Sequence, residues 1–188
     1  MSSSTQAGNP VSGIAGGAEA LRNLYYARFG FAIVWAGLLA LTASTLTPVG
    51  IVLLVAYPLF DVAAAVIDFR SSNAARPRVA LYANMASSLL TAIGLAFAVT
   101  SGIPSVLRVW GAWAITAGIV QLIVAILRYR LGGQWAMILS GGLSAVAGTT
   151  FVVQAGGTTA TLTNVAGYAA VGGVFFLISA IRLHRRGR

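Results

Sequence analysis

Six apolar runs dominate this sequence and restrict the folds that the chain can adopt. They cover residues 24–45, 49–69, 79–99, 106–127, 135–153 and 162–183. A helix of about 20 apolar residues crosses the hydrocarbon core of a bilayer and satisfies its own backbone hydrogen bonds there. The sequence therefore predicts an all-α membrane protein with six transmembrane helices.

The composition excludes most soluble folds and most catalytic chemistry. Charged residues make up 8% of the chain, whereas a soluble domain carries about 25%. There is no cysteine and no lysine, so thiolate nucleophiles, Ser/Lys pairs and lysine-containing phosphate loops are excluded. Three acidic residues and one histidine, His184 in the basic tail, are too few for a metal site built from side chains. We therefore expect no enzyme, no catalytic residue, no metal and no cofactor.

The positions of the arginines predict how the chain is oriented. The net charge is +9, and eleven of the twelve arginines lie at places that six spans bring to one side of the membrane. The exception is Arg108. Because basic residues collect on the cytoplasmic side, we expect both termini in the cytoplasm. There the arginines would meet anionic lipid head groups, and their short runs at span ends argue against nucleic-acid binding.

A repeat of about 55 residues divides the chain into three helical hairpins. Pro48 and Pro104 precede even-numbered runs, and Thr159 takes this place in the third unit. Nine residues further on, each unit carries an aromatic residue: Tyr57, Trp113 and Tyr168. Each hairpin enters and leaves on the same side, so the three repeats are parallel. We expect them to form a bundle with approximate threefold pseudo-symmetry.

The predicted units are a flexible cytoplasmic tail and three hairpins. The boundaries are 1–22 for the tail and 23–75, 76–131 and 132–188 for the hairpins. Small residues recur at four-residue steps on the predicted helices, for example Ala114-Gly118 and Ser140-Ser144-Gly148. Such rows let helix backbones approach closely in lipid. They indicate packing within the chain, although some could instead serve a homo-oligomer or a partner membrane subunit.

Two stretches resemble a known family. "QWAMILSGGLSAVAGTTFVV" and "GYAAVGGVFFLISAIRLHRR", together with the hairpin repeats and their prolines, are similar to the HdeD-like proteins. These are small six-span bacterial proteins of unknown function, whose namesake is linked to acid resistance. The resemblance implies a multi-pass protein of the bacterial inner membrane with a role in stress or acid tolerance. It implies no catalytic residues.

Two of the three acidic residues lie in one predicted helix. Asp61 and Asp68 are seven residues apart, so they share a helix face about 10 Å apart along the axis. Asp68 lies close to Arg70 and therefore to the interface, where it can stay hydrated. Arg28 enters the neighbouring helix from the same side, and we predict an Arg28–Asp68 ion pair that holds the hairpin together.

Asp61 lies near the predicted midplane, where a carboxylate costs at least about 2.5–3.5 kcal/mol. Pro58 precedes it by three residues and removes a backbone hydrogen bond. One interpretation is structural: a protonated Asp61 donates to a carbonyl such as that of Tyr57, or bonds Asn84 or Gln121. The other is that Asp61 faces a cavity and titrates or binds a cation.

The two interpretations lead to two functions. The first is a non-enzymatic structural or interaction protein, or a stress-tolerance protein, built as a compact bundle. The alternative is a small proton-responsive or solute and cation transport protein that uses Asp61, with Pro58 as its hinge.

The predicted topology can be tested with single cysteines, because the chain has none of its own. Cysteines at Ser44 and Gly156, in two connections opposite the termini, should react with an impermeant maleimide added to intact cells. Reaction only after permeabilisation would contradict six spans with cytoplasmic termini.

Overall fold

The computed structural model describes residues 10–71, 78–127, 129–131 and 135–186. Within these ranges every regular element is helical. The elements are α1 (Pro10–Leu41), α2 (Pro48–Ser71), α3 (Arg78–Ala98), η1 (Val99–Ser101), α4 (Ile103–Leu127), η2 (Tyr129–Leu131), α5 (Trp135–Gln154) and α6 (Thr163–Arg186).

All six long helices are long and apolar enough to cross a membrane, which confirms the six predicted spans. The largest difference lies in α1. It begins at Pro10 and therefore takes up more than half of the tail predicted for residues 1–22, the first nine of which lie outside the described ranges. Proline suits the first turn of a helix because its missing N–H would have no partner there. The helix also ends at Leu41, four residues before the predicted end.

The outside of the bundle is apolar. Val34, Leu90, Phe97 and Val153 are each more than 60% exposed, and they lie on three different helices. Contiguous exposed apolar surface is unusual in soluble proteins and is typical of surfaces that face lipid or a partner. The surface and the helix lengths together make the chain a multi-pass membrane protein.

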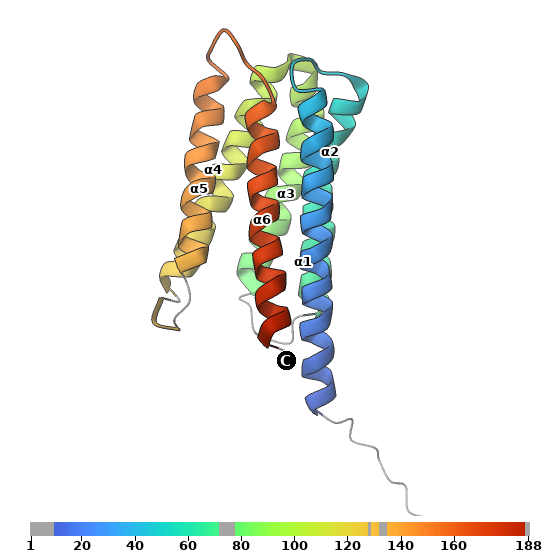
Figure 1. Cartoon of the computed structure of the whole chain (residues 1–188). Coiled ribbons are helices and arrows are strands. Elements are labelled where there is room, and N and C mark those ends of the chain that lie inside the picture. The colour runs from blue at the N-terminus through green and yellow to red at the C-terminus, as the bar shows by residue number, and fades with distance from the viewer. Residues whose placement is uncertain (1–9, 72–77, 128, 132–134, 187–188) are drawn as a thin grey trace, which may run out of the picture.

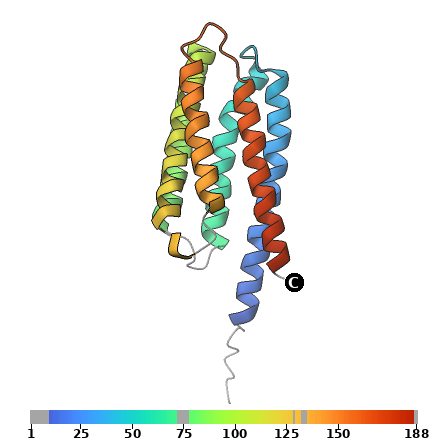
Figure 2. The ribbon, with the colours of Figure 1, turned by 60° about the vertical axis from the view of Figure 1, so that its left-hand side comes forward.

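The helices run side by side and alternate in direction (Figures 1 and 2). Residues 42–47, 99–102 and 155–162 connect them at one end, which we call the connection end. The start of α1 and the end of α6 lie at the other, the terminus end. The closest neighbours are α4 with α5, α1 with α6, and α2 with α3, whereas α5 and α6 touch sparsely. Close packing is therefore between helices of different hairpins more than between the two helices of one hairpin.

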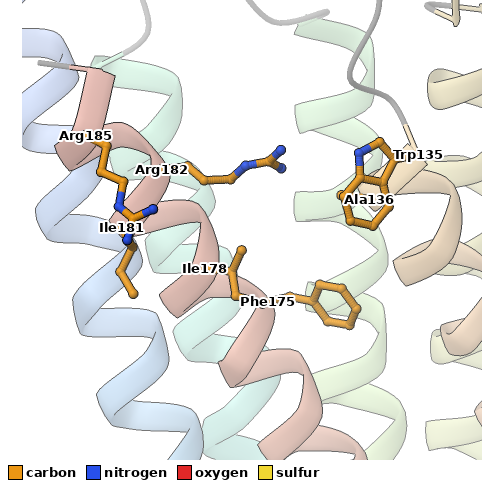
Figure 3. A pocket seen from close by; sticks show the side chains of 7 residues that line it. All are labelled: Trp135, Ala136, Phe175, Ile178, Ile181, Arg182 and Arg185. Atoms are coloured by element: carbon orange, nitrogen blue, oxygen red, sulfur yellow. The ribbon is translucent and has the colours of Figure 1, made fainter.

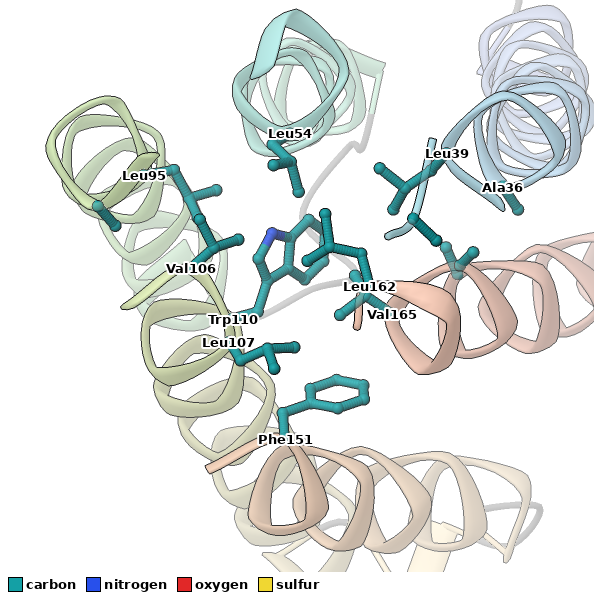
Figure 4. Close-up of a cluster of buried hydrophobic side chains, with 14 of the residues drawn as sticks. Ala36, Leu39, Leu54, Leu95, Val106, Leu107, Trp110, Phe151, Leu162 and Val165 are labelled. Atoms are coloured by element: carbon teal, nitrogen blue, oxygen red, sulfur yellow. The ribbon is translucent and has the colours of Figure 1, made fainter. Parts of the chain in front are cut away.

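A hydrophobic core fills the connection-end half of the bundle. Trp110 is fully buried at its centre, among leucines from several helices and Phe151 of α5 (Figure 4). The last connection closes over this core, because the Leu162 N–H donates to the Ala43 carbonyl at 2.9 Å. The Thr161 hydroxyl donates to the same carbonyl at 3.2 Å. These two hydrogen bonds hold the α5–α6 connection against the end of α1.

Glycines bring α4 and α5 into backbone contact at two levels. A Cβ atom on Gly111 would lie 2.7 Å from the Gly148 carbonyl oxygen, and one on Gly148 would lie 2.6 Å from that of Gly111. About two turns further along α4, a Cβ on Gly118 would lie 2.6 Å from the Gly141 carbonyl oxygen. These positions have no room for a side chain, so part of the predicted small-residue rows serves packing within the chain.

Neighbouring glycines of α5 give a matched test of this contact. A Cβ on Gly141 would lie 2.9 Å from the Gly118 oxygen, whereas one on Gly142 meets nothing within 4 Å. Gly141→Ala should lower the free energy of unfolding in detergent by about 1–3 kcal/mol, because the backbones must move apart. Gly142→Ala should be neutral or stabilising by up to about 1 kcal/mol. Equal effects of the two substitutions would contradict the close contact.

Candidate functional site: a polar cavity around an ion pair

A cavity of about 650 Å³ occupies the terminus-end half of the bundle. All six long helices contribute to its wall, and it extends to Ala80 and Ala136, close to the first residues of α3 and α5. Its polar lining comprises Arg28, Asp61, Asp68, Asn84, Ser87, Thr116, Gln121, Ser140, Ser144 and Ser179. We call this space the central cavity.

An aromatic layer separates the central cavity from the hydrophobic core. Its members are the residues that the repeat predicted at equivalent places: Tyr57, Trp113 and Tyr168. The Tyr57 ring lies 6.1 Å from Trp113 and 5.5 Å from the core residue Trp110, centroid to centroid. The Tyr168 hydroxyl is hydrogen-bonded to Ser144 at 3.0 Å. The layer closes the inner end of the cavity with large side chains.

Arg28 of α1 and Asp61 of α2 form an ion pair on the cavity wall, with side chains 12% and 16% exposed. The second oxygen of Asp61, Oδ2, accepts hydrogen bonds from Asn84 Nδ2 and Ser88 Oγ, both at 2.8 Å and both on α3. The guanidinium carbon of Arg28 also lies 4.5 Å from the centroid of the Phe176 ring on α6. This cluster therefore connects four helices.

The sequence did not predict this pairing of Arg28 with Asp61, and the Arg28–Asp68 pair that it named stays a prediction. Arg28 lies thirteen residues before the end of α1 at Leu41, and Asp61 lies thirteen residues after the start of α2 at Pro48. In an antiparallel hairpin, both are therefore about 20 Å from the turn and level with each other. Asp68 lies about 10 Å further towards the terminus end. The prediction placed Arg28 at the membrane interface, because it began the first span at residue 24.

Asp68 itself is buried rather than hydrated at the interface. Only 1% of the residue is exposed, and it lines the part of the central cavity closer to the terminus end. Both aspartates of α2 line the central cavity and therefore share one face of the helix, as their spacing of seven residues predicted.

Pro58 lies inside α2 and is fully buried, and the helix continues through it to Ser71. Because proline has no N–H, the Leu54 carbonyl loses its usual helical donor. On the neighbouring residue, the Leu53 carbonyl accepts a hydrogen bond of 2.6 Å from the Trp35 indole N–H. This bond ties α1 to α2 beside the proline. The proposed role of Pro58 as a hinge stays a prediction.

The structure selects among the partners suggested for Asp61. Asn84 donates to it, whereas Gln121 lines the cavity without being one of its hydrogen-bond partners. Tyr57 is also on the cavity wall, and its hydroxyl-bearing ring belongs to the aromatic layer. Ser88 was missed as a site residue. It follows Asn84 by four residues on the same helix face, and this spacing could have identified it.

The arrangement of charges limits what Asp61 can bind. Its carboxylate is already balanced by Arg28, and both of its oxygens accept hydrogen bonds. A cation at Asp61 would have to displace the guanidinium. Among the residues that the structure describes, no three His, Asp or Glu side chains gather as metal ligands do. The remaining polar wall consists mainly of hydroxyls and amides, which suit a polar solute with hydrogen-bonding groups.

The fold and the site define a class: a multi-pass helical membrane protein with a ligand-sized polar cavity in one half. The chain matches no protein-family model, no curated protein and no solved structure. The resemblance to the HdeD-like proteins therefore stays a prediction.

Removing one partner of the ion pair should be far more costly than removing both charges. Arg28→Met should lower the free energy of unfolding by about 3–5 kcal/mol, because it leaves the Asp61 carboxylate enclosed without a counter-charge. Adding Asp61→Asn should recover most of this loss, since Asn keeps groups that can bond Asn84 and Ser88. Unfolding of the four proteins of this double-mutant cycle in detergent measures the coupling.

A surface ion pair provides the control for this cycle. Arg22 pairs with Glu19 at 3.2 Å, and the Glu19 side chain is 66% exposed. Arg22→Met should cost no more than about 1 kcal/mol. Additive losses for Arg28 and Asp61, or a loss at Arg28 as small as that at Arg22, would contradict the pairing.

Proposed function

We propose that the protein is a small-solute transport protein and that the central cavity is its substrate site. The observation that carries this proposal is the cavity of about 650 Å³ bounded by all six helices. Protein interiors are close-packed, with few voids larger than a water molecule. Pockets for small ligands measure about 300–1,000 Å³. A bundle that served only as a scaffold would gain stability by filling this space.

The chemistry of the wall supports a small polar solute as the substrate. Ionisable residues within membrane spans mark substrate or ion pathways, or interior pairs. Here a paired Arg28 and Asp61 stand beside hydroxyls and amides, including Gln121 and Ser140. Such a wall offers donors and acceptors without a large net charge. A cation carrier, which the sequence suggested as an alternative, has less support because Arg28 occupies the carboxylate.

The division of the bundle into two halves supports transport over simple binding. The central cavity reaches the terminus end, whereas the hydrophobic core and the aromatic layer fill the other half. This arrangement fits a conformation of a transporter in which the cavity is closed to solvent at the connection end. Passage would require the core around Trp110 to open, and Pro58 in the middle of α2 is our candidate for the hinge.

The proposal includes an orientation and a symmetry. The arginine distribution favours cytoplasmic termini in the bacterial inner membrane, so the cavity would reach the cytoplasmic side. The three close helix pairs and the layer of Tyr57, Trp113 and Tyr168 support three pseudo-equivalent hairpins. A structural or interaction role has less support, because Gly111, Gly118, Gly141 and Gly148 are used within the chain. Acid tolerance rests on the family resemblance alone.

Accessibility of the cavity tests the proposal directly. A single cysteine at Ser140, on the cavity wall, should react with a small charged thiol reagent applied to the terminus-end side of the membrane. A cysteine at Leu39, which is fully buried in the core, should not react. An unreactive Ser140→Cys variant in the folded protein would mean that no solute reaches the cavity, and the proposed function would fail.

Two glycines of α6 allow the cavity to be blocked with a matched control. A side chain added at Gly172, on the cavity wall, meets nothing within 4 Å, and the same holds at Gly167, which is exposed on the outside. Gly172→Leu should slow the labelling of Ser140→Cys by filling the cavity, whereas Gly167→Leu should leave it unchanged. Equal rates in both variants would show that the reagent reaches Ser140 by another route.

A further inference from the structure

A second hollow lies between α5 and α6 at the terminus end, separate from the ion pair. It has a volume of about 330 Å³ and is lined by Trp135, Ala136, Phe175, Ile178, Ile181, Arg182 and Arg185 (Figure 3). We call it the α5–α6 groove. These two helices pack sparsely, which leaves the space between them.

The groove changes from apolar to basic along α6. Ile178 precedes Arg182 by four residues, and Ile181 precedes Arg185 by four. Each isoleucine therefore lies one turn before an arginine, on the same face of α6. The isoleucines are 45% and 38% exposed and offer an apolar surface to the membrane. The arginines stand in the last turns of α6, towards the end of the helix.

Trp135 indicates that the basic end of the groove lies at the membrane interface. It is the first residue of α5 and is 62% exposed. Tryptophan is enriched at the boundary between head groups and acyl chains. The guanidinium carbon of Arg182 lies 5.9 Å from the Trp135 ring centroid, and Figure 3 shows the arginine reaching across the groove towards it.

The charges in the groove are not balanced by acids from the described chain. Glu19 pairs with Arg22 and Asp61 pairs with Arg28, and neither of these ion pairs involves the groove. The remaining acid, Asp68, is buried in the central cavity. Two exposed guanidinium groups above an apolar surface are therefore available to an anion that also carries a hydrocarbon chain.

We propose that the α5–α6 groove binds one anionic phospholipid of the adjacent leaflet. Its phosphate lies between Arg182 and Arg185, since guanidinium groups form charge-assisted hydrogen bonds with phosphate oxygens. One acyl chain lies along Ile178 and Ile181 between the two helices. A free phosphate would satisfy the arginines but would leave this apolar surface uncovered. The site does not depend on the proposed transport function.

The groove and the central cavity share a wall. Ala136 and Phe175 line both spaces, so the acyl chain of the bound lipid would pack against the boundary of the cavity. The lipid would therefore fill the gap that the sparse packing of α5 and α6 leaves beside the cavity.

Quenching of tryptophan fluorescence by brominated lipids tests the site in the full-length chain. Trp135 is 62% exposed, whereas Trp35 and Trp110 are no more than 1% exposed and Trp113 is half-buried in the wall of the central cavity. In phosphatidylcholine nanodiscs, a small fraction of brominated phosphatidylglycerol should quench with an apparent affinity about tenfold higher than that of brominated phosphatidylcholine. Arg182→Gln/Arg185→Gln should remove this preference, and Trp135→Phe should remove most of the quenching.

A second pair of arginines separates a specific site from general attraction to a basic surface. Arg70 and Arg130 are exposed at the same end of the bundle but lie outside the groove. Arg70→Gln/Arg130→Gln should keep the preference for phosphatidylglycerol. Circular dichroism checks that both double variants remain folded.

Three results would overturn the proposal. The first is equal quenching by the two lipids in the unmodified chain. The second is an equal loss of preference in both double variants, which would assign the effect to diffuse surface charge. The third is a dimer in nanodiscs that Arg182→Gln/Arg185→Gln dissociates, which would assign the groove to a second copy of the chain.

Discussion

The ion pair between Arg28 and Asp61 is the interaction around which the terminus-end half of the bundle is organised. A charge inside a membrane is tolerated when a partner of opposite sign stands beside it. The two residues are level with each other on α1 and α2, and Asn84 and Ser88 on α3 complete the hydrogen bonding of the carboxylate. Three helices are thereby held in one register. The cluster also needs polar surroundings, so this half cannot close into an apolar core.

The connection-end half is apolar and closely packed. It contains large apolar side chains around Trp110 and is closed by hydrogen bonds to the Ala43 carbonyl. Close packing is unequal around the ring of helices, because the glycines bring α4 and α5 into backbone contact, whereas α5 and α6 remain apart. One bundle thus combines a packed half, a hollow half and one loose seam. The proposed transport function uses the hollow half, and the proposed lipid site uses the loose seam.

The two proposals address neighbouring parts of the molecule and use different chemistry. The central cavity offers paired charges, hydroxyls and amides to a polar solute. The α5–α6 groove offers arginines above isoleucines to an anionic lipid. The residues Ala136 and Phe175 lie between them. A lipid bound in the groove would therefore contribute to the cavity wall on the side where the protein packs most loosely.

The sequence by itself determined the elements of this protein, because about 20 apolar residues in a row have one stable form in lipid. It also identified Asp61, Asn84, the aromatic residues of the inner layer and part of the α4–α5 contact, since helical spacing is local. It did not identify the pairing of Arg28 with Asp61, because that depends on where α1 ends and therefore on the register of two helices. The central cavity and the α5–α6 groove were likewise beyond it. They arise from unequal distances between the packed helices, and only the tertiary structure decides those distances.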